Sequence, residues 1–235
     1  MTRVEAGFFV TGTDTGVGKT RVACALVTRL RALGFDVGAM KPVETGVGPA
    51  GPADAIALRA AAGSVDPLED VCPQRFVLPA APDVAAAAEG RSVDLAAIRA
   101  AFDRVKVRHE WLVAEGAGGL LAPLTEAVSM ADLAGWLGLP LVLVARARLG
   151  TINHTRLTLE AARARGLGVA GVVISRADGE LSDPDARNLA RLRSELGELC
   201  VGELPFLAPG APVPPGAIDV ERLIERVRVG ARWDN

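Results

Sequence analysis

The chain has 235 residues, half of them hydrophobic, so it is long enough to bury a sizeable core. Its formal net charge of −2 excludes a general attraction for nucleic acid or anionic lipid. No apolar run approaches the length of a membrane span and the N-terminus lacks a signal-peptide layout, so we expect a cytoplasmic protein that binds neither nucleic acid nor membrane. Cys24, Cys72 and Cys200 are widely spaced, and we expect reduced thiols.

Strand-like and helix-like runs alternate along the chain, which favours an α/β fold with a mostly parallel sheet. The expected strands are residues 7–12, 35–40, 110–116, 139–147 and 169–177. The expected helices are residues 19–34, 54–63, 79–90, 92–105, 129–137, 151–165 and 183–196. The proline-rich stretch 205–217 is expected to be extended and to cover part of the surface. Since no linker or repeat divides the sequence, we predict that residues 1–235 form a single domain.

A glycine-rich turn, VTGTDTGVGKT, joins the first expected strand to the first expected helix. A helix N-terminus exposes unpaired backbone N–H groups and partial positive charge, which favour phosphate. Lys19 adds a positive charge and the Thr20 hydroxyl suits Mg²⁺. The glycines that let a polyphosphate approach the backbone are Gly12, Gly16 and Gly18. Gly12 lies one residue earlier than in the usual pattern, so the loop is one residue longer; it predicts nucleotide binding but no particular reaction.

Lys41 directly follows the second expected strand, within FDVGAMKPVETG. Pro42 keeps the preceding backbone extended and ends the strand at the rim of the sheet. Because ligands bind at the carboxyl ends of the strands in an open parallel sheet, we expect Lys41 at the same edge as the phosphate loop. By residue type alone, Lys41 would be a solvated surface lysine, and Thr45 and Gly46 would be a turn.

A carboxylate closes the expected strand EWLVAEG, where Glu115 precedes a second run of glycines. A carboxylate at this rim can reach Mg²⁺ held by nucleotide phosphates, and glycines let the backbone approach a ligand. Asp54, at the start of the second expected helix, is either a second acidic ligand or a helix-capping aspartate. Thr20, Asp54 and Glu115 are therefore a candidate set of protein ligands for Mg²⁺.

A further strand-to-helix turn, LGTINHT at residues 149–155, offers backbone N–H groups that could hold a carboxylate. His154 is a candidate acid or base, but a histidine in the first turn of a helix is more often structural. His109 stands beside Glu110 just before a strand, and we expect it to be exposed.

Taken together, TGTDTGVGKT, KPVETG, Asp54, EGAGG from Glu115, LGTINHT and GELPF from Gly202 resemble the dethiobiotin synthetase family of biotin biosynthesis. The match covers nearly the whole chain in order. The resemblance implies a P-loop NTPase-like α/β fold with helices on both faces of the sheet, and a homodimer with the substrate site at the subunit interface. It also implies a cyclo-ligase that forms C–N bonds, converting 7,8-diaminononanoate, carbon dioxide and MgATP to dethiobiotin, ADP and phosphate through a carbamate and a carbamic-phosphoric anhydride.

The resemblance further implies roles for individual residues. Lys19 neutralises the phosphates, Lys41 steadies the carbamate and the transferring phosphoryl group, and Mg²⁺ is held by Thr20, Asp54 and Glu115. The nucleotide is contacted by Gly16, Val17, Gly18, Lys19, Thr20, Arg21, Asp54, Glu115, Gly116, Ala117, Gly118, Ser175, Arg176, Leu204, Pro205 and Phe206. The diamine is contacted by Thr15, Lys41, Thr45 and Gly118. The turn of Gly150, Thr151, Ile152 and Asn153 binds the tail carboxylate of substrate lying in the partner subunit.

Two departures from the family pattern concern ligand recognition. Many members place an asparagine that reads adenine at the end of the strand VAGVVIS, whereas Ser175 followed by Arg176 stands here, which leaves nucleotides other than ATP open. The chain contains no tyrosine, so any tyrosine contact to the substrate tail is absent.

Other classes of protein share such a phosphate loop. A partition-type ATPase carries an additional lysine early in the loop, where Thr13 and Asp14 stand here, and the missing basic patch also disfavours it. A cobyrinate-synthetase-like ligase adds a glutaminase domain, for which we expect this chain to be too short. A non-catalytic nucleotide-binding scaffold would turn over no ATP with any diamine.

Overall fold

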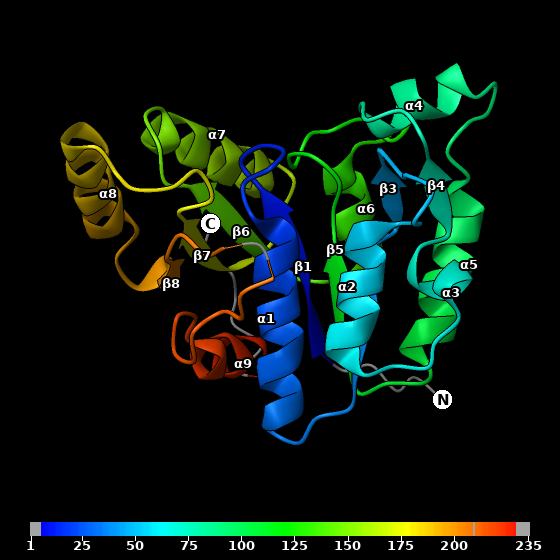
Figure 1. Cartoon of the computed structure of the whole chain (residues 1–235), viewed down its shortest axis with the longest axis horizontal. Helices are drawn as coiled ribbons and strands as arrows, with labels where there is room; N and C mark the ends of the chain where they lie inside the picture. The colour runs from blue at the N-terminus through cyan, green and yellow to red at the C-terminus, as the bar shows by residue number, and fades with distance from the viewer. Residues whose placement is uncertain (1–5, 209, 229–235) are drawn as a thin grey trace.

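The computed structural model describes residues 6–208 and 210–228. Its centre is a six-stranded sheet in the order β2-β5-β1-β6-β7-β8, and every neighbouring pair is parallel (Figure 1). The strands are β1 (Ala6–Gly12), β2 (Val37–Met40), β5 (Trp111–Glu115), β6 (Leu141–Arg146), β7 (Val169–Ser175) and β8 (Cys200–Leu204). The predicted fold class, α/β with a mostly parallel sheet, is confirmed.

The helices predicted from the sequence all occur within a few residues of their expected bounds. They are α1 (Lys19–Ala32), α2 (Ala53–Ala62), α4 (Pro82–Ala88), α5 (Leu95–Lys106), α6 (Met130–Leu137), α7 (Thr151–Ala164) and α8 (Asp183–Leu196). Local capping explains several of these starts: Ser129 forms a capping box with Asp132 before α6, and the Asp94 carboxylate accepts the Ala97 N–H at the start of α5.

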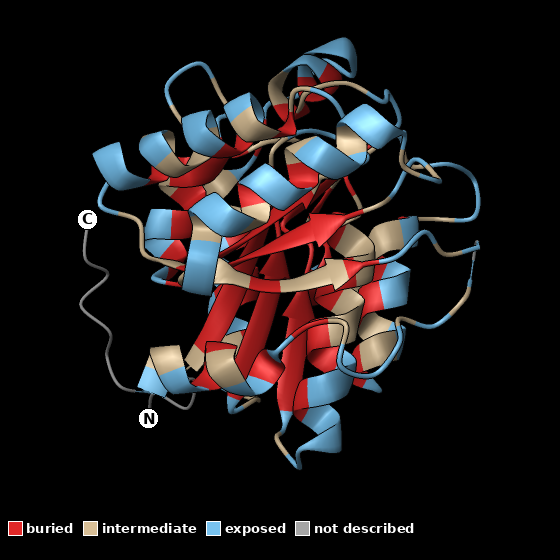
Figure 2. Ribbon diagram, turned by 90° about the vertical axis from the view of Figure 1, so that its left-hand side faces the viewer, coloured by how far each residue is buried: buried red, intermediate tan, exposed pale blue. Residues whose placement is uncertain are grey.

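Two hydrophobic cores lie on opposite faces of the sheet. Successive strand residues point to opposite faces, so Phe8 packs in the core beneath α1, α2 and α9 (Val220–Arg228), and Phe9 packs in the core beneath α5 and α6. Figure 2 shows most of the strands buried, whereas the helices expose their outer faces. Because both faces are covered, the strands form continuous apolar runs, which made them recognisable in the sequence.

Six short elements among the described residues were not predicted. They are β3 (Val43–Thr45), α3 (Leu68–Val71), β4 (Gln74–Phe76), the 3₁₀ helix η1 (Gly197–Leu199), β8 and α9. β3 and β4 pair in parallel as a separate two-stranded sheet, and three residues are too few to show a periodicity. β8 is an edge strand in which only Val201 and Leu204 are buried, so it lacks the apolar run of the central strands.

The proline-rich stretch lies over α1, as expected for a surface cover. Residues 210–216 and α1 line an apolar groove of about 530 Å³. Cys24, Cys72 and Cys200 are free thiols, in agreement with the prediction. Within the described residues, no helix combines the length and the apolar character needed to cross a bilayer. The expectation about the N-terminal layout falls partly on residues 1–5, which lie outside the described residues, as does residue 209 of the proline-rich stretch.

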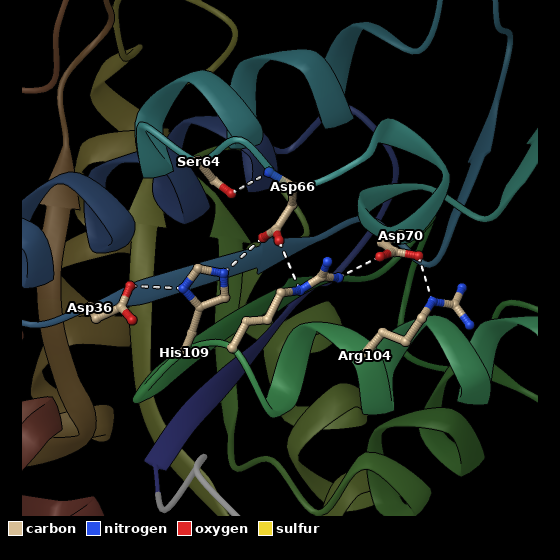
Figure 3. Close-up of polar contacts among 7 residues, drawn as sticks. Asp36, Ser64, Asp66, Asp70, Arg104 and His109 are labelled. Atoms are coloured by element: carbon tan, nitrogen blue, oxygen red, sulfur yellow. Dashed lines mark hydrogen bonds and ion pairs between the residues drawn. The ribbon is translucent and has the colours of Figure 1, made fainter.

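The expectation that His109 is exposed is wrong. His109 belongs to a cluster of ion pairs at the amino end of the strands, which we call the ionic clasp (Figure 3). The His109 side chain is only 13% exposed, with Nδ1 2.8 Å from Asp36 and Nε2 2.8 Å from Asp66. Arg108 pairs with Asp66 and Asp70, and Arg104 with Asp70. The clasp, defined as Asp36, Asp66, Asp70, Arg104, Arg108 and His109, joins the segment after α2 to the end of α5.

Replacing His109 by alanine is expected to lower the free energy of unfolding by about 1–3 kcal/mol, because Asp66, whose side chain is 4% exposed, loses one of its partners. Each of the two ring nitrogens faces a carboxylate, Nδ1 that of Asp36 and Nε2 that of Asp66. Urea denaturation measures the effect. His154→Ala is the matched control because His154 is exposed; equal stability of the two variants would contradict the structural role of His109.

Candidate active site

The phosphate-loop sequence joins β1 to α1 at the carboxyl edge of the sheet. Gly18 adopts a φ of +95°, and a Cβ atom there would lie 2.6 Å from Ser175 Oγ, so only glycine fits. The Thr13 N–H donates to the Val144 carbonyl at 3.0 Å, which fixes the loop to β6. Lys19 Nζ donates to the Asp14 carbonyl at 2.8 Å. The loop is therefore tied to the sheet, with a lysine lying across it.

Lys41 and Glu115 meet because their strands are neighbours. β2 pairs with β5 so that Met40 lies opposite Ala114, and the next residues along are Lys41 and Glu115. Lys41 Nζ lies 2.5 Å from Glu115 Oε1 and 2.8 Å from Asp54 Oδ2. The Thr20 hydroxyl donates to Glu115 Oε1 at 2.9 Å. The structure thus brings Thr20, Lys41, Asp54 and Glu115 together, from four different elements or their ends.

Burial and charge act in opposite directions on these groups. Burial lowers the pKa of Lys41, but Glu115 and Asp54 outweigh it and raise the pKa, so Lys41 stays charged. Burial together with the nearby charge of Lys41 lowers the pKa of Lys19 to about 8. Burial raises the pKa of Glu115, with Lys41 acting against it. The Glu115 side chain is only 1% exposed, and the positive charge of Lys41 compensates for placing the carboxylates of Glu115 and Asp54 beside each other.

The oxygens at this cluster suit a divalent cation that also binds phosphate. Glu115 Oε2 is buried and has no hydrogen-bond partner among the residues that the structure describes. The same residues contain no group of three His, Cys, Asp or Glu side chains that could hold a metal by themselves. Two carboxylates and a hydroxyl are nevertheless a typical protein contribution to Mg²⁺, which takes its remaining ligands from phosphate and water.

A cavity of about 440 Å³ connects the phosphate loop, the carboxylate cluster and the loops after β7 and β8. Predicted residues in its lining are Thr15, Gly16, Gly18, Lys19, Thr20, Arg21, Lys41, Thr45, Asp54, Glu115, Ala117, Gly118, Ser175, Arg176, Leu204, Pro205 and Phe206. The structure therefore places Lys41 at the same edge as the phosphate loop. Arg21 lines both this cavity and the groove along α1, and its guanidinium donates to the carbonyls of Leu207 and Ala208 at 2.9 and 3.0 Å.

Some predicted residues do not line this cavity. Val17 is fully buried in the core, and Gly116 packs closely against Phe9 and Met130. The turn of Gly150, Thr151, Ile152 and Asn153 lies at the start of α7, outside the lining.

Three lining residues were not predicted from the sequence: Glu44, Ala177 and Leu207. Ala177 and Leu207 continue predicted motifs by one residue. Glu44 carried no signal beyond its position in KPVETG, because its partners are backbone N–H groups of another element.

The chain matches a family model described as an AAA domain over residues 6–212. Proteins named ATP-dependent dethiobiotin synthetase are similar to it. The relative from Anaeromyxobacter dehalogenans is 54% identical over 79% of this chain and 85% of its own length. That from Aromatoleum aromaticum is 42% identical over 90% and 95%, and that from Bacillus licheniformis is 39% identical over 96% and 98%.

Solved structures show the same fold at low sequence identity. A MinC:MinD cell division complex from Aquifex aeolicus aligns with a TM-score of 0.55 and 12% identity, covering 94% of both chains. A putative plasmid partition protein from Borrelia burgdorferi aligns with a TM-score of 0.54 and 10% identity, covering 96% of this chain and 98% of its own. These likenesses concern the fold alone. With relatives at 39–54% identity over most of their length, the chain belongs to the family of the ATP-dependent dethiobiotin synthetases.

Proposed function

We propose that the protein is a cytoplasmic ATP-dependent dethiobiotin synthetase, which carboxylates 7,8-diaminononanoate and closes the cyclic urea at the expense of ATP. The observation that carries the proposal is the placement of Lys41 and the phosphate loop around one cavity, in a chain of this family. The partition-type and cobyrinate-synthetase-like alternatives lack comparable support, because the likeness to partition proteins concerns the fold alone.

The proposed reaction brings two anions together. An amine of the substrate takes up carbon dioxide as a carbamate, whose oxygen attacks the γ-phosphate and displaces ADP. The neighbouring amine then attacks the carbonyl carbon of the mixed anhydride, which closes the urea ring and releases phosphate. Fixed positive charge lowers the repulsion between carbamate and triphosphate, and positioning with charge stabilisation supplies most of phosphoryl-transfer catalysis. Lys19 would neutralise the phosphates and Lys41 would steady the carbamate, with Thr15, Thr45 and Gly118 contacting the diamine.

Thr20, Asp54 and Glu115 are the residues that would hold Mg²⁺, since they cluster beside the phosphate loop and Glu115 Oε2 is buried without a partner among the described residues. When bound, Mg²⁺ would supply positive charge to the phosphate oxygens. Ser175, Arg176, Leu204, Pro205 and Phe206 would surround the base, as they line the same cavity as the phosphate loop.

We also propose a homodimer in which each subunit completes the other's substrate site. The turn at residues 150–153 lies outside the cavity, and its backbone N–H groups begin the 14-residue helix α7, which is a suitable end for binding a carboxylate. A role toward substrate held by the partner subunit agrees with that position.

Purified protein with 7,8-diaminononanoate, bicarbonate and MgATP is expected to release phosphate in step with dethiobiotin. Phosphate is followed by a coupled assay and dethiobiotin by mass spectrometry, with the diamine omitted as control. Phosphate release that ignores the diamine would reject the assignment and favour an ATPase switch. Absence of turnover with or without diamine would favour a nucleotide-binding scaffold.

A further inference from the structure

Helix α2, which carries Asp54, begins without a cap of its own. Its N-cap residue is Pro52, which makes no side-chain cap hydrogen bond. The carboxylate of Glu44 in β3 takes that place from another element: Oε1 accepts the Asp54 N–H and Oε2 accepts the Ala55 N–H, both at 3.0 Å. Asp54 is thus not the capping residue of α2. Its backbone is held by a side chain ten residues earlier in the chain.

The two carboxylates beside Lys41 are held in different ways. Glu115 ends a central strand, and its side chain is 1% exposed, so the sheet fixes its position. The Asp54 side chain is 39% exposed and stands in the first turn of a helix. Two of the hydrogen bonds that hold Asp54 at the rim are the one between its carboxylate and Lys41 and the one between its N–H and Glu44. Both contacts come from the same short segment, since Lys41 follows β2 and Glu44 lies in β3.

Glu44 is itself fixed by its surroundings. It is 6% exposed, and β3 pairs with β4 so that Glu44 lies opposite Arg75. A negative charge is also favoured at a helix N-terminus, where N–H groups point outward. Each carboxylate oxygen of Glu44 satisfies one N–H, so both of its acceptors are used on α2.

We propose that Glu44 is a positioning residue of the cation site: it holds the first turn of α2 so that the Asp54 carboxylate stays beside Glu115. The proposal rests on the proposed function, in which Asp54 is a ligand of Mg²⁺. Glu44 acts through the backbone of Asp54, in the way that outer-shell partners orient metal ligands in other proteins.

Glu44→Gln tests this with a minimal change of shape. The amide keeps one acceptor but turns the other into a donor, so one of the two N–H groups of α2 faces an NH₂ group. We expect the Mg²⁺ concentration for half-maximal turnover to rise about tenfold or more, the range typical for loss of such a partner. The maximal rate at saturating Mg²⁺ is expected to recover to within about threefold, since Lys19 and Lys41 are unchanged.

Calorimetric titration with ATP gives a second readout that does not depend on turnover. The dissociation constant of ATP without Mg²⁺ is expected to match the wild type, whereas the gain in affinity on adding Mg²⁺ is expected to shrink about tenfold. If Glu44→Gln does not fold, Glu44→Asp retains both acceptor oxygens but withdraws them by one methylene, and we expect the same increase in Mg²⁺ requirement.

Asp94→Asn is the matched control. Asp94 also caps a helix through a carboxylate, accepting the Ala97 N–H at 2.9 Å, but on α5 away from the cavity. It is expected to lower stability without changing the Mg²⁺ requirement. An unchanged requirement in the Glu44 variants would overturn the proposal if Asp54→Asn raises it. No change in Asp54→Asn would instead reject Asp54 as a cation ligand, and with it this part of the proposed function.

Discussion

Lys41→Ala is expected to lower turnover by about 10²–10³-fold, as for loss of one positioned group that stabilises developing charge, while ATP still binds. In the proposed function the phosphates are held by the loop before α1, whereas Lys41 Nζ donates to Asp54 and Glu115, so nucleotide affinity is expected to stay near the wild-type value. Diamine-dependent phosphate release measures turnover, and calorimetry measures ATP binding. An unchanged rate would remove Lys41 from the proposed chemistry.

The control for Lys41→Ala is the replacement of a lysine that lies outside the cavity. Only three lysines are present, Lys19, Lys41 and Lys106, and two of them line the same cavity. Lys106 lies at the end of α5, with its Nζ 5.8 Å from the Phe102 ring centroid, so Lys106→Ala should leave turnover unchanged. Removing one partner of a buried ion pair costs about 3–5 kcal/mol, so circular dichroism and ATP binding are recorded on the same sample to show that the variant is folded.

Lys19→Ala is expected to weaken MgATP binding by about 10–100-fold, corresponding to loss of a hydrogen bond to a charged group. Its effect is also expected to depend on pH. The pKa of Lys19 is lowered to about 8, so the free protein loses this charge as pH rises above about 8. Since phosphate favours the charged lysine, ATP affinity of the wild type should fall above pH 8.

The pH dependence assigns this effect to Lys19 rather than to Lys41. Lys41 has a raised pKa and remains charged through the same range. Calorimetry between about pH 7 and pH 9.5 therefore should show falling ATP affinity in the wild type and a flat, weaker affinity in Lys19→Ala, given a lowered pKa near 8. A fall of equal slope in both proteins would place the titrating group elsewhere.

Elements defined by residues close along the chain were predictable, whereas contacts between distant segments were not. The central strands and the helices were predictable because each carries a periodic apolar pattern within its own residues. β3 and β4 were not, since each has three residues and pairs only with the other. His109 was expected to be exposed because its neighbours in sequence are polar, yet Asp36 and Asp66 reach it from other segments.

The residues of the candidate site likewise include some that could be predicted from the sequence and some that could not. The phosphate loop was recognisable because its glycines, Lys19 and Thr20 are contiguous, and the strand before it and the helix after it follow from local pattern. Lys41 and Glu115 could be assigned to one rim because each stands at the carboxyl end of a strand. Their ion pair could not be predicted, because it depends on β2 and β5 being neighbours. Glu44 could not be found, because its two partners are backbone N–H groups of α2.

The amino-acid sequence by itself determined the α/β class, the course of the main elements, the phosphate loop and the family resemblance, since these depend on residues that are close along the chain. Only the tertiary structure decided that Lys41 is buried between Glu115 and Asp54, that Glu44 caps α2, and that His109 belongs to an ionic clasp. Each of these depends on strand order and on the packing of α2 or α5 against the sheet, which bring together groups that are separated in sequence and set their charge and burial.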